Sequence, residues 1–307
     1  MVTALVTAQA GTGGLTPNPV DDLRQLFAFH FMVNAFRAGT VVAVTAGAIG
    51  WFMVLRRQSF AGHTLAVVSF PGAAGAILLG VSATAGYFVA AVAAALLIAL
   101  VPRSTSGQAH GQESAVIGTV QAFALACGAL FVSLYGGFLN DLTGLLFGTF
   151  LGVSDAQVRT LFLVALGTLA VLGAVGRPLF FTTVDPDVAR ARGVSVRLMS
   201  TVFLVLLGCT AAEVSQITGA LLVFALLVMP AAAAQRLTPR PVLSFGLTIA
   251  FGLAIVWLGL GFAYFSVYPV GFFVTTIGFG LYLLAVAGRA GLDRLGREAR
   301  LRRAAAR

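Results

Sequence analysis

The 307-residue sequence has few charged residues and no lysine: only 9% of it is charged, and all 19 basic residues are arginine. Soluble domains carry about 25% charged residues. The scarcity of charge, with 59% hydrophobic residues and a mean hydropathy of +0.99, excludes an ordinary soluble domain. The arginines, which produce the net charge of +9, occupy short gaps between apolar runs and the C-terminal tail. They do not gather on one folded polar face, which argues against nucleic-acid binding.

Cysteine and enzyme motifs are also scarce. Cys127 and Cys209 both lie within apolar runs and lack the spacing of a metal or redox motif, so we expect them to pack as small apolar side chains. The sequence contains no GxxxxGK[ST] phosphate-binding loop, no HExxH and no GxSxG. These absences argue against an ATPase and against an intramembrane protease. We therefore predict that the chain is not an enzyme and holds no resident cofactor.

Apolar segments are abundant, and each is close to the roughly 20 residues that cross about 30 Å of hydrocarbon. We predict an all-α, polytopic integral membrane protein with about nine transmembrane helices, within a range of eight to ten. The predicted spans are 35–55, 62–81, 83–101, 114–134, 158–182, 194–213, 217–235, 242–263 and 267–288. The junction AEVSQITG leaves almost no loop between the sixth and seventh spans. If one of these two is short or re-entrant, the count becomes eight.

The chain divides into three predicted parts. Residues 1–34 form an N-terminal tail and, over residues 21–34, an interfacial helix; residues 35–288 form the transmembrane domain, and residues 289–307 form a basic tail. In a nine-span topology almost all arginines fall on one side of the membrane, and the exceptions are Arg24, Arg37 and Arg159. Because arginines collect in cytoplasmic loops, this pattern predicts an N-terminus outside and a cytoplasmic C-terminal tail.

A short helix is predicted in the gap after the fifth span, at about 185–193. Asp185 suits the N-cap, Pro186 the first helical position and Asp187 the first turn, and Gly193 suits the end of the helix. A solvated turn would account for the nearby arginines but not for both caps. Such a short, capped helix on the inner face is suited to docking in a groove of a cytoplasmic partner.

Four stretches of the sequence resemble the membrane permease subunit of zinc- and manganese-type ATP-binding-cassette importers. They are GWFMVLRRQSFAGHTLAVVSFPGAAGAILLG (50–80), ESAVIGTVQAFALACGALFVSLY (113–135), VDPDVARARGVSVRLMSTVFLVLL (184–207) and GALLVFALLVMPAAAAQRL (219–237). The resemblance implies a homodimer or a pair of permeases in the lipid of a bacterial cytoplasmic membrane, with separate ATPase subunits and an extracellular metal-binding protein that delivers the ion. It also implies that the 185–193 helix couples to the ATPase through Asp185, Pro186, Asp187, Ala189, Arg190 and Gly193.

The resemblance also points to a metal pathway in the stretch GHTLAVVSFPG. Members of this family typically carry an acid and a histidine four residues apart, on one helix face. Here His63 occupies the position of the acid and Val67 that of the histidine. His63 can supply one nitrogen ligand, two copies in a dimer could present two, and nitrogen favours zinc over manganese. A packed histidine is the alternative, and whether another residue replaces the ligand missing at Val67 stays open.

Other polar and helix-breaking residues provide further candidates. Glu213, with Gln216 nearby, is a second predicted pathway residue, because a carboxyl group within a span tends to face a polar cavity; a position at the outer headgroup level is the alternative. Pro71–Gly72 and Pro230 are predicted to act as gates or hinges, with structural kinks as the alternative. Two other functions remain: the same fold carrying a metal chelate or another small nutrient, and a secondary cation carrier that uses Glu213 without ATP.

Overall fold

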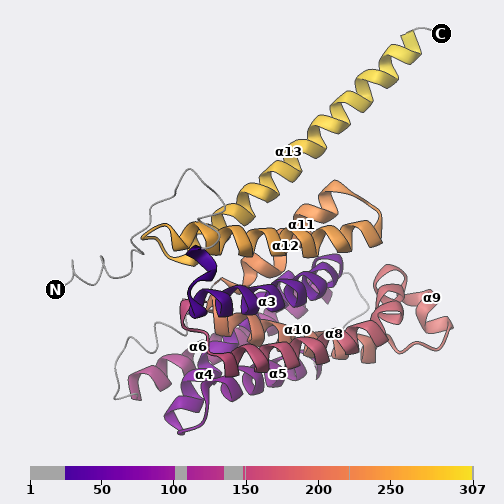
Figure 1. The fold of residues 1–307 in the computed structure, drawn as a ribbon. Helices are drawn as coiled ribbons and strands as arrows, with labels where there is room; N and C mark the ends of the chain where they lie inside the picture. The colour runs from indigo at the N-terminus through magenta and orange to yellow at the C-terminus, as the bar shows by residue number, and fades with distance from the viewer. Residues whose placement is uncertain (1–24, 101–108, 135–147, 149, 221, 306–307) are drawn as a thin grey trace.

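The computed structural model describes residues 25–100, 109–134, 148, 150–220 and 222–305. Within these residues the regular structure is entirely helical (Figure 1). The elements are α3 (His30–Leu55), α4 (Ser59–Leu78), α5 (Ala83–Leu100), α6 (Ala109–Leu134), the 3-10 helix η1 (Phe150–Gly152), α8 (Asp155–Val184), α9 (Pro186–Ala191), α10 (Val196–Thr218), α11 (Val223–Leu237), α12 (Pro241–Tyr264) and α13 (Val270–Ala305).

Among the described residues, eight helices are long and apolar enough to cross a membrane, which confirms the predicted polytopic membrane fold. α11 is apolar as well but has only 15 residues. At 1.5 Å per residue it is about 22 Å long, less than the roughly 30 Å hydrocarbon core. α10 continues to Thr218, beyond the predicted end at residue 213. The alternative in which one helix of this pair is short is therefore the one observed.

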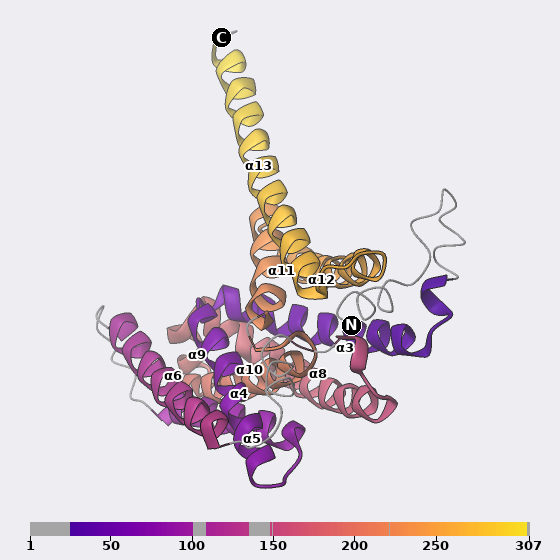
Figure 2. The same ribbon diagram turned by 90° about the vertical axis from the view of Figure 1, so that its left-hand side faces the viewer.

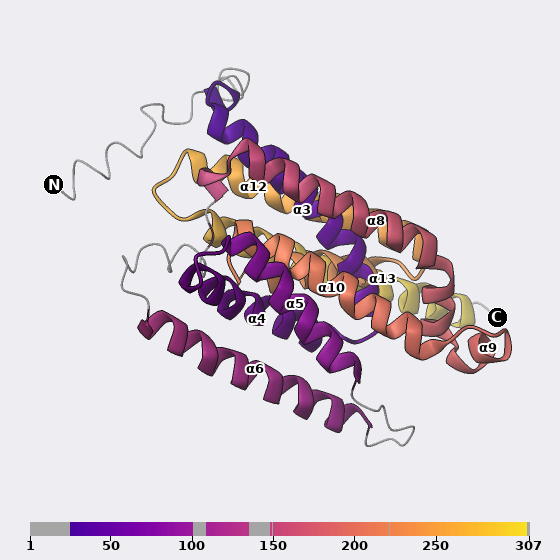
Figure 3. The ribbon, with the colours of Figure 1, turned by 90° about the horizontal axis from the view of Figure 1, so that it is seen from below.

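The bundle has a buried centre and exposed flanks. α3, α4 and α10 are mostly buried, whereas α6 and α13 are mostly exposed. α8 lies beside α3 on one flank, α6 forms the edge beyond α4, and α10 lies between these flanks (Figure 3). The C-terminal part of α13 extends away from the other helices (Figure 2). α9 projects from one end of the bundle, here called the α9 end, and the opposite end, where η1 lies, is called the η1 end.

The start of α3 differs from the predicted interfacial helix over residues 21–34. α3 begins at His30 and includes Asn34, so the last part of that segment belongs to the long helix. The Asn34 side-chain amide donates to the Val153 carbonyl at 3.2 Å, and His30 Nε2 lies 3.0 Å from Asp155 Oδ2. These contacts fix the polar start of α3 against η1 and α8. Residues 1–24 lie outside the described residues.

Glycine and proline residues allow close helix contacts at the predicted hinges. A Cβ atom at Gly72 of α4 would collide with the Gly86 carbonyl of α5, so the two backbones touch. α4 continues through Pro71 to Leu78, and the Pro71 ring packs on Gly128 of α6. Small residues permit such approaches between membrane helices. Pro71–Gly72 therefore sits at a junction of three helices, and its role as a hinge stays a prediction.

Candidate functional site

His63 lies one turn into α4, at the half-buried surface between α4 and α11. Its ring makes an edge-to-face contact with Phe224 of α11, with 5.5 Å between the ring centroids. Phe224 is itself 36% exposed, so this pair of rings reaches the surface of the chain. The next residue on this face of α4, Val67, is buried. The structure thus places His63 where something outside the chain can contact it.

The described part of one chain does not build a complete metal cage. No group of three or more His, Cys, Asp or Glu side chains is found together in it. Zinc sites usually have four ligands, and borderline cations need more than one donor for tight binding. A cation at His63 would therefore need a second imidazole from another copy, backbone oxygens or water. Such an open site suits brief contact with a passing ion.

Glu213 lies on α10 and is fully buried within the chain. Its Oε1 atom is 3.4 Å from the hydroxyl of Thr45, near the middle of α3, and that hydroxyl also donates to the Val41 carbonyl at 2.9 Å. The other carboxyl oxygen, Oε2, has no hydrogen-bond partner among the described residues. This position is enclosed by helices, and its place in the transport pathway stays a prediction. No hydrogen bond or ion pair among the described residues joins Glu213 to His63, whose ring contacts Phe224 of α11.

Three neighbours of Glu213 also carry buried oxygen atoms without partners. They are the hydroxyls of Thr210 and Ser215 and the Oε1 atom of Gln216, counted within the described residues. Thr210, Glu213 and Gln216 share one face of α10 because they are three residues apart. Unpaired buried polar groups are costly and usually hold water or contribute to function. Gln216 Nε2 donates to the Ala212 carbonyl at 3.3 Å, which holds its side chain along the helix.

The predicted inner-face helix is present as α9, and its first turn is capped as expected. Asp185 accepts a hydrogen bond from the backbone N–H of Val188 at 3.0 Å, which defines it as the N-cap. Pro186 occupies the first turn, where its missing N–H leaves no bond unmade. Arg190 and Asp187 form an exposed ion pair at 2.6 Å. Exposed pairs of this kind stabilise little, so the caps determine where the helix begins and ends.

The end of α9 has a Schellman geometry. The N–H of Val194 donates to the Ala189 carbonyl at 3.0 Å, and the N–H of Gly193 donates to the Arg190 carbonyl at 2.9 Å. Gly193 has φ +78°, a conformation that favours glycine. Ala189 is buried, so its methyl group packs against the chain itself. The outward surface of α9 and its flanks instead carries exposed Val184, Val188 and Leu198, apolar side chains available to a partner.

Arg56 is a positioning residue that the sequence did not reveal. It follows α3, and its guanidinium donates to the hydroxyls of Thr183 on α8 (2.9 Å) and Ser200 on α10 (2.7 Å). The same group lies over the ring of Phe203 at 5.2 Å. Thr183 and Ser200 belong to the two helices that flank α9. Arg56 therefore connects the base of α9 to the centre of the bundle. Its pairing with Arg57 in the sequence indicated only an inner-side loop.

The chain is similar to known proteins over almost the whole transmembrane region. Residues 28–289 match the model of the ABC 3 transport family. The chain is 30% identical over 243 residues to the manganese transport system membrane protein MntC of Halalkalibacterium halodurans, covering 79% of this chain and 81% of that protein. It is 32% identical over 251 residues to the chelated iron transport system membrane protein YfeC of Yersinia pestis, covering 81% of this chain and 82% of that protein.

A solved structure supports the same arrangement of helices. The structure of PsaBC from Streptococcus pneumoniae in complex with Fab superposes with a TM-score of 0.77 at 26% sequence identity. The match covers 87% of this chain and 95% of that chain. The similarity thus extends over the whole bundle.

Proposed function

Because the chain belongs to the ABC 3 transport family, we propose that it is the membrane permease of an importer that moves a divalent metal ion inward by ATP-driven alternating access. ATP hydrolysis takes place on separate ATPase subunits, in keeping with the absence of a phosphate-binding loop from this sequence. Two copies form the transmembrane pathway in a bacterial cytoplasmic membrane. The α9 end faces the cytoplasm, and an extracellular metal-binding protein delivers the ion at the η1 end.

The observation that carries the coupling role is α9 itself. This six-residue helix is capped at both ends, projects from the bundle and is flanked by exposed apolar side chains. A projecting helix of defined length can fit a groove on the ATPase and move with it. Arg56 then transmits that movement, because its hydrogen bonds join α8 and α10 to the end of α3. Asp185 and Gly193 fix the shape of the helix, while Asp187 and Arg190 present charge to the partner.

The observation that carries the metal assignment is the surface position of His63. In a homodimer with its axis beside α4 and α11, two imidazoles would face the pathway. Nitrogen ligands suit zinc better than manganese, which prefers oxygen-rich sites, so we place zinc ahead of manganese. Glu213 and Gln216 are buried in this structure, so they contact the ion only if α3 and α10 separate during transport. Pro71 and Gly72 lie on α4 and Pro230 lies on α11, the two helices that meet at His63, and these residues would act as hinges there.

Transport of a metal chelate is the second candidate, and Val67 is the observation that favours it. With an apolar side chain where a second ligand is expected, the pathway provides less direct coordination for a bare ion. A chelate brings its own ligands and needs only a channel of suitable shape. YfeC, the relative at 32% identity, is named for chelated iron transport.

Uptake into vesicles tests the proposal. The full-length chain is reconstituted with its ATPase and binding protein, and uptake of zinc, manganese and a ferric chelate is followed with and without ATP. We expect metal uptake that requires both ATP and the ATPase subunit. The matched control carries an ATPase that binds but does not hydrolyse ATP. Metal uptake that is equal in this control would indicate a secondary carrier and contradict the proposal.

A further inference from the structure

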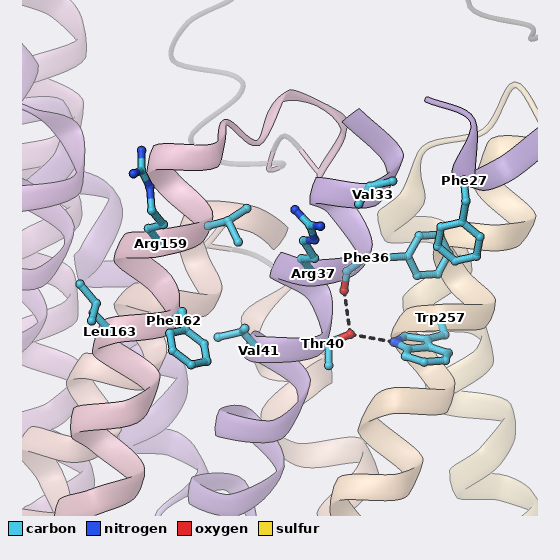
Figure 4. Close-up of a pocket in the computed structure, with 11 residues that line it drawn as sticks. Phe27, Val33, Phe36, Arg37, Thr40, Val41, Arg159, Phe162, Leu163 and Trp257 are labelled. Atoms are coloured by element: carbon cyan, nitrogen blue, oxygen red, sulfur yellow. Dashed lines mark hydrogen bonds between the residues drawn. The ribbon is translucent and has the colours of Figure 1, made fainter. Parts of the chain in front are cut away.

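A groove of about 720 Å³ opens near the η1 end on the face formed by α3, α8 and α12 (Figure 4). Its walls are almost entirely apolar and include the side chains of Phe27, Phe36, Val41, Phe162, Leu163 and Trp257. The indole of Trp257 is held by a 3.0 Å hydrogen bond to Thr40, whose hydroxyl donates in turn to the Phe36 carbonyl at 2.7 Å. The ring of Trp257 is therefore fixed in the wall of the groove.

Two arginines stand at the end of the groove that lies nearer η1. Arg37 of α3 and Arg159 of α8 are both exposed, and their guanidinium groups point towards the η1 end, beyond the apolar walls (Figure 4). No ion pair links either group to a residue that the structure describes. The nearby carboxylate of Asp155 is 3.0 Å from His30 Nε2 and also interacts with the charge of Arg37, so it offsets part of the positive charge at this end. The groove thus combines long apolar walls with two cationic side chains at one end.

We propose that this groove binds an anionic glycerophospholipid. An acyl chain would lie along the apolar walls between α3 and α8, and the phosphate would lie between Arg37 and Arg159. Guanidinium groups match phosphate oxygens in charge and in planar geometry. They also lie at one end of the bundle, where lipid headgroups meet a membrane helix. The assignment to the outer leaflet rests on the proposed function, which places the α9 end in the cytoplasm.

Lipid suits this face better than a second copy of the chain. The proposed dimer axis passes beside His63, which contacts α11 from α4, whereas the groove is formed by α3, α8 and α12. Viewed from below, α8 and α4 lie on opposite sides of α10 (Figure 3). A face away from the dimer axis meets lipid in a membrane. An exposed tryptophan near a headgroup is typical of the membrane interface, and Trp257 is 52% exposed.

The two tryptophans of the chain, Trp51 and Trp257, allow a direct measurement. The Trp51→Phe protein is reconstituted in phosphatidylcholine vesicles with increasing fractions of brominated phosphatidylglycerol, and quenching of Trp257 is followed. Brominated phosphatidylcholine provides the zwitterionic reference. We expect a relative binding constant roughly fivefold or more in favour of the anionic lipid, because each of the two arginines contributes about 1 kcal/mol at a membrane surface and the Asp155 carboxylate offsets part of this. If Trp51→Phe folds poorly, the difference between wild type and Trp257→Phe gives the same signal.

Two double variants distinguish the effect of the two groove arginines from the effect of the total charge of the chain. Arg37→Gln with Arg159→Gln should lower the preference for the anionic lipid to about onefold. Arg197→Gln with Arg236→Gln removes the same charge from two other exposed arginines and should leave the preference at Trp257 unchanged. Val41→Phe narrows the groove while keeping both arginines, and it should weaken quenching by both lipids.

Three outcomes would overturn the lipid site. They are equal quenching by the two lipids in the wild-type groove, a preference that persists after loss of Arg37 and Arg159, and a Trp257 that neither lipid quenches. The last outcome would indicate that another protein surface, such as a second copy, covers the groove. No metal, ATP or partner enters this assay, so its result is independent of the transport proposal.

Discussion

Replacing Gly193 by alanine should weaken coupling to the ATPase by a purely local effect. Gly193 has φ +78°, and a Cβ atom built there would meet nothing within 4 Å. No packing clash therefore adds to the backbone cost, which for an L-residue in the left-handed region is about 1–2 kcal/mol. α9 has only six residues, too few for a helix to be stable without its caps. The substitution therefore destabilises the capped form of α9 by the full backbone cost.

The magnitude follows from the equilibrium between capped and open forms of this turn. A cost of about 1–2 kcal/mol changes that equilibrium about 5- to 30-fold. If the ATPase binds only the capped form and that form is marginally stable, its apparent Kd rises by up to the same factor. Binding of the purified ATPase to the reconstituted permease, and the ATP hydrolysed per ion transported, measure the two consequences.

Two matched variants test the reasoning. Gly193→Asn should cost less than Gly193→Ala, because asparagine tolerates the left-handed region better. Gly167→Ala, on α8, adds the same methyl group at a helical glycine that also has open space, and it should leave ATPase binding unchanged. Wild-type binding and coupling in Gly193→Ala, or an equal defect in Gly167→Ala, would refute the role assigned to the end of α9.

Three other substitutions have defined expectations. Arg56→Ala removes the links to Thr183 and Ser200, and we expect ATP hydrolysis to continue while metal uptake per ATP falls several-fold; unchanged stoichiometry would exclude Arg56 from coupling. Gly72→Ala pushes α4 away from α5, and it should lower the free energy of unfolding in detergent by about 1–3 kcal/mol. Gly118→Ala should leave it unchanged, because a Cβ atom at Gly118 would meet nothing within 4 Å. Glu213→Gln keeps the oxygen that faces Thr45, so stability should hold while uptake slows; wild-type uptake would place Glu213 outside the pathway.

Local chemistry made α9 predictable. Its N-cap (Asp185), its first-turn proline (Pro186) and its final glycine (Gly193) lie close together in the sequence, and each acts on backbone groups within a few residues. Hydropathy made the long spans predictable for a similar reason, because crossing a bilayer imposes a length on each segment separately. The family that the sequence motifs suggested is confirmed by the match of residues 28–289 to the ABC 3 transport family.

Contacts between distant segments were not predictable. The polar residues His30 and Asn34 suggested an interfacial helix, but Asp155 and Val153, more than a hundred residues later, give them partners in the start of α3. Hydropathy alone does not separate a 15-residue helix such as α11 from a full span, because its apolar residues continue into the preceding turn. Likewise, Arg56 resembled an ordinary loop arginine until the fold brought α8 and α10 to it.

The central claim, that a divalent metal passes His63 in an ATP-driven permease, is tested most directly by the ratio of zinc to manganese uptake. Initial ATP-driven rates are compared for wild type, His63→Ala and His63→Asp, with His30→Ala as the control at the η1 end. We predict that His63→Ala lowers zinc uptake, and that His63→Asp shifts the ratio towards manganese because an oxygen replaces a nitrogen ligand. Identical rates and ratios in all four proteins would contradict a metal pathway at His63.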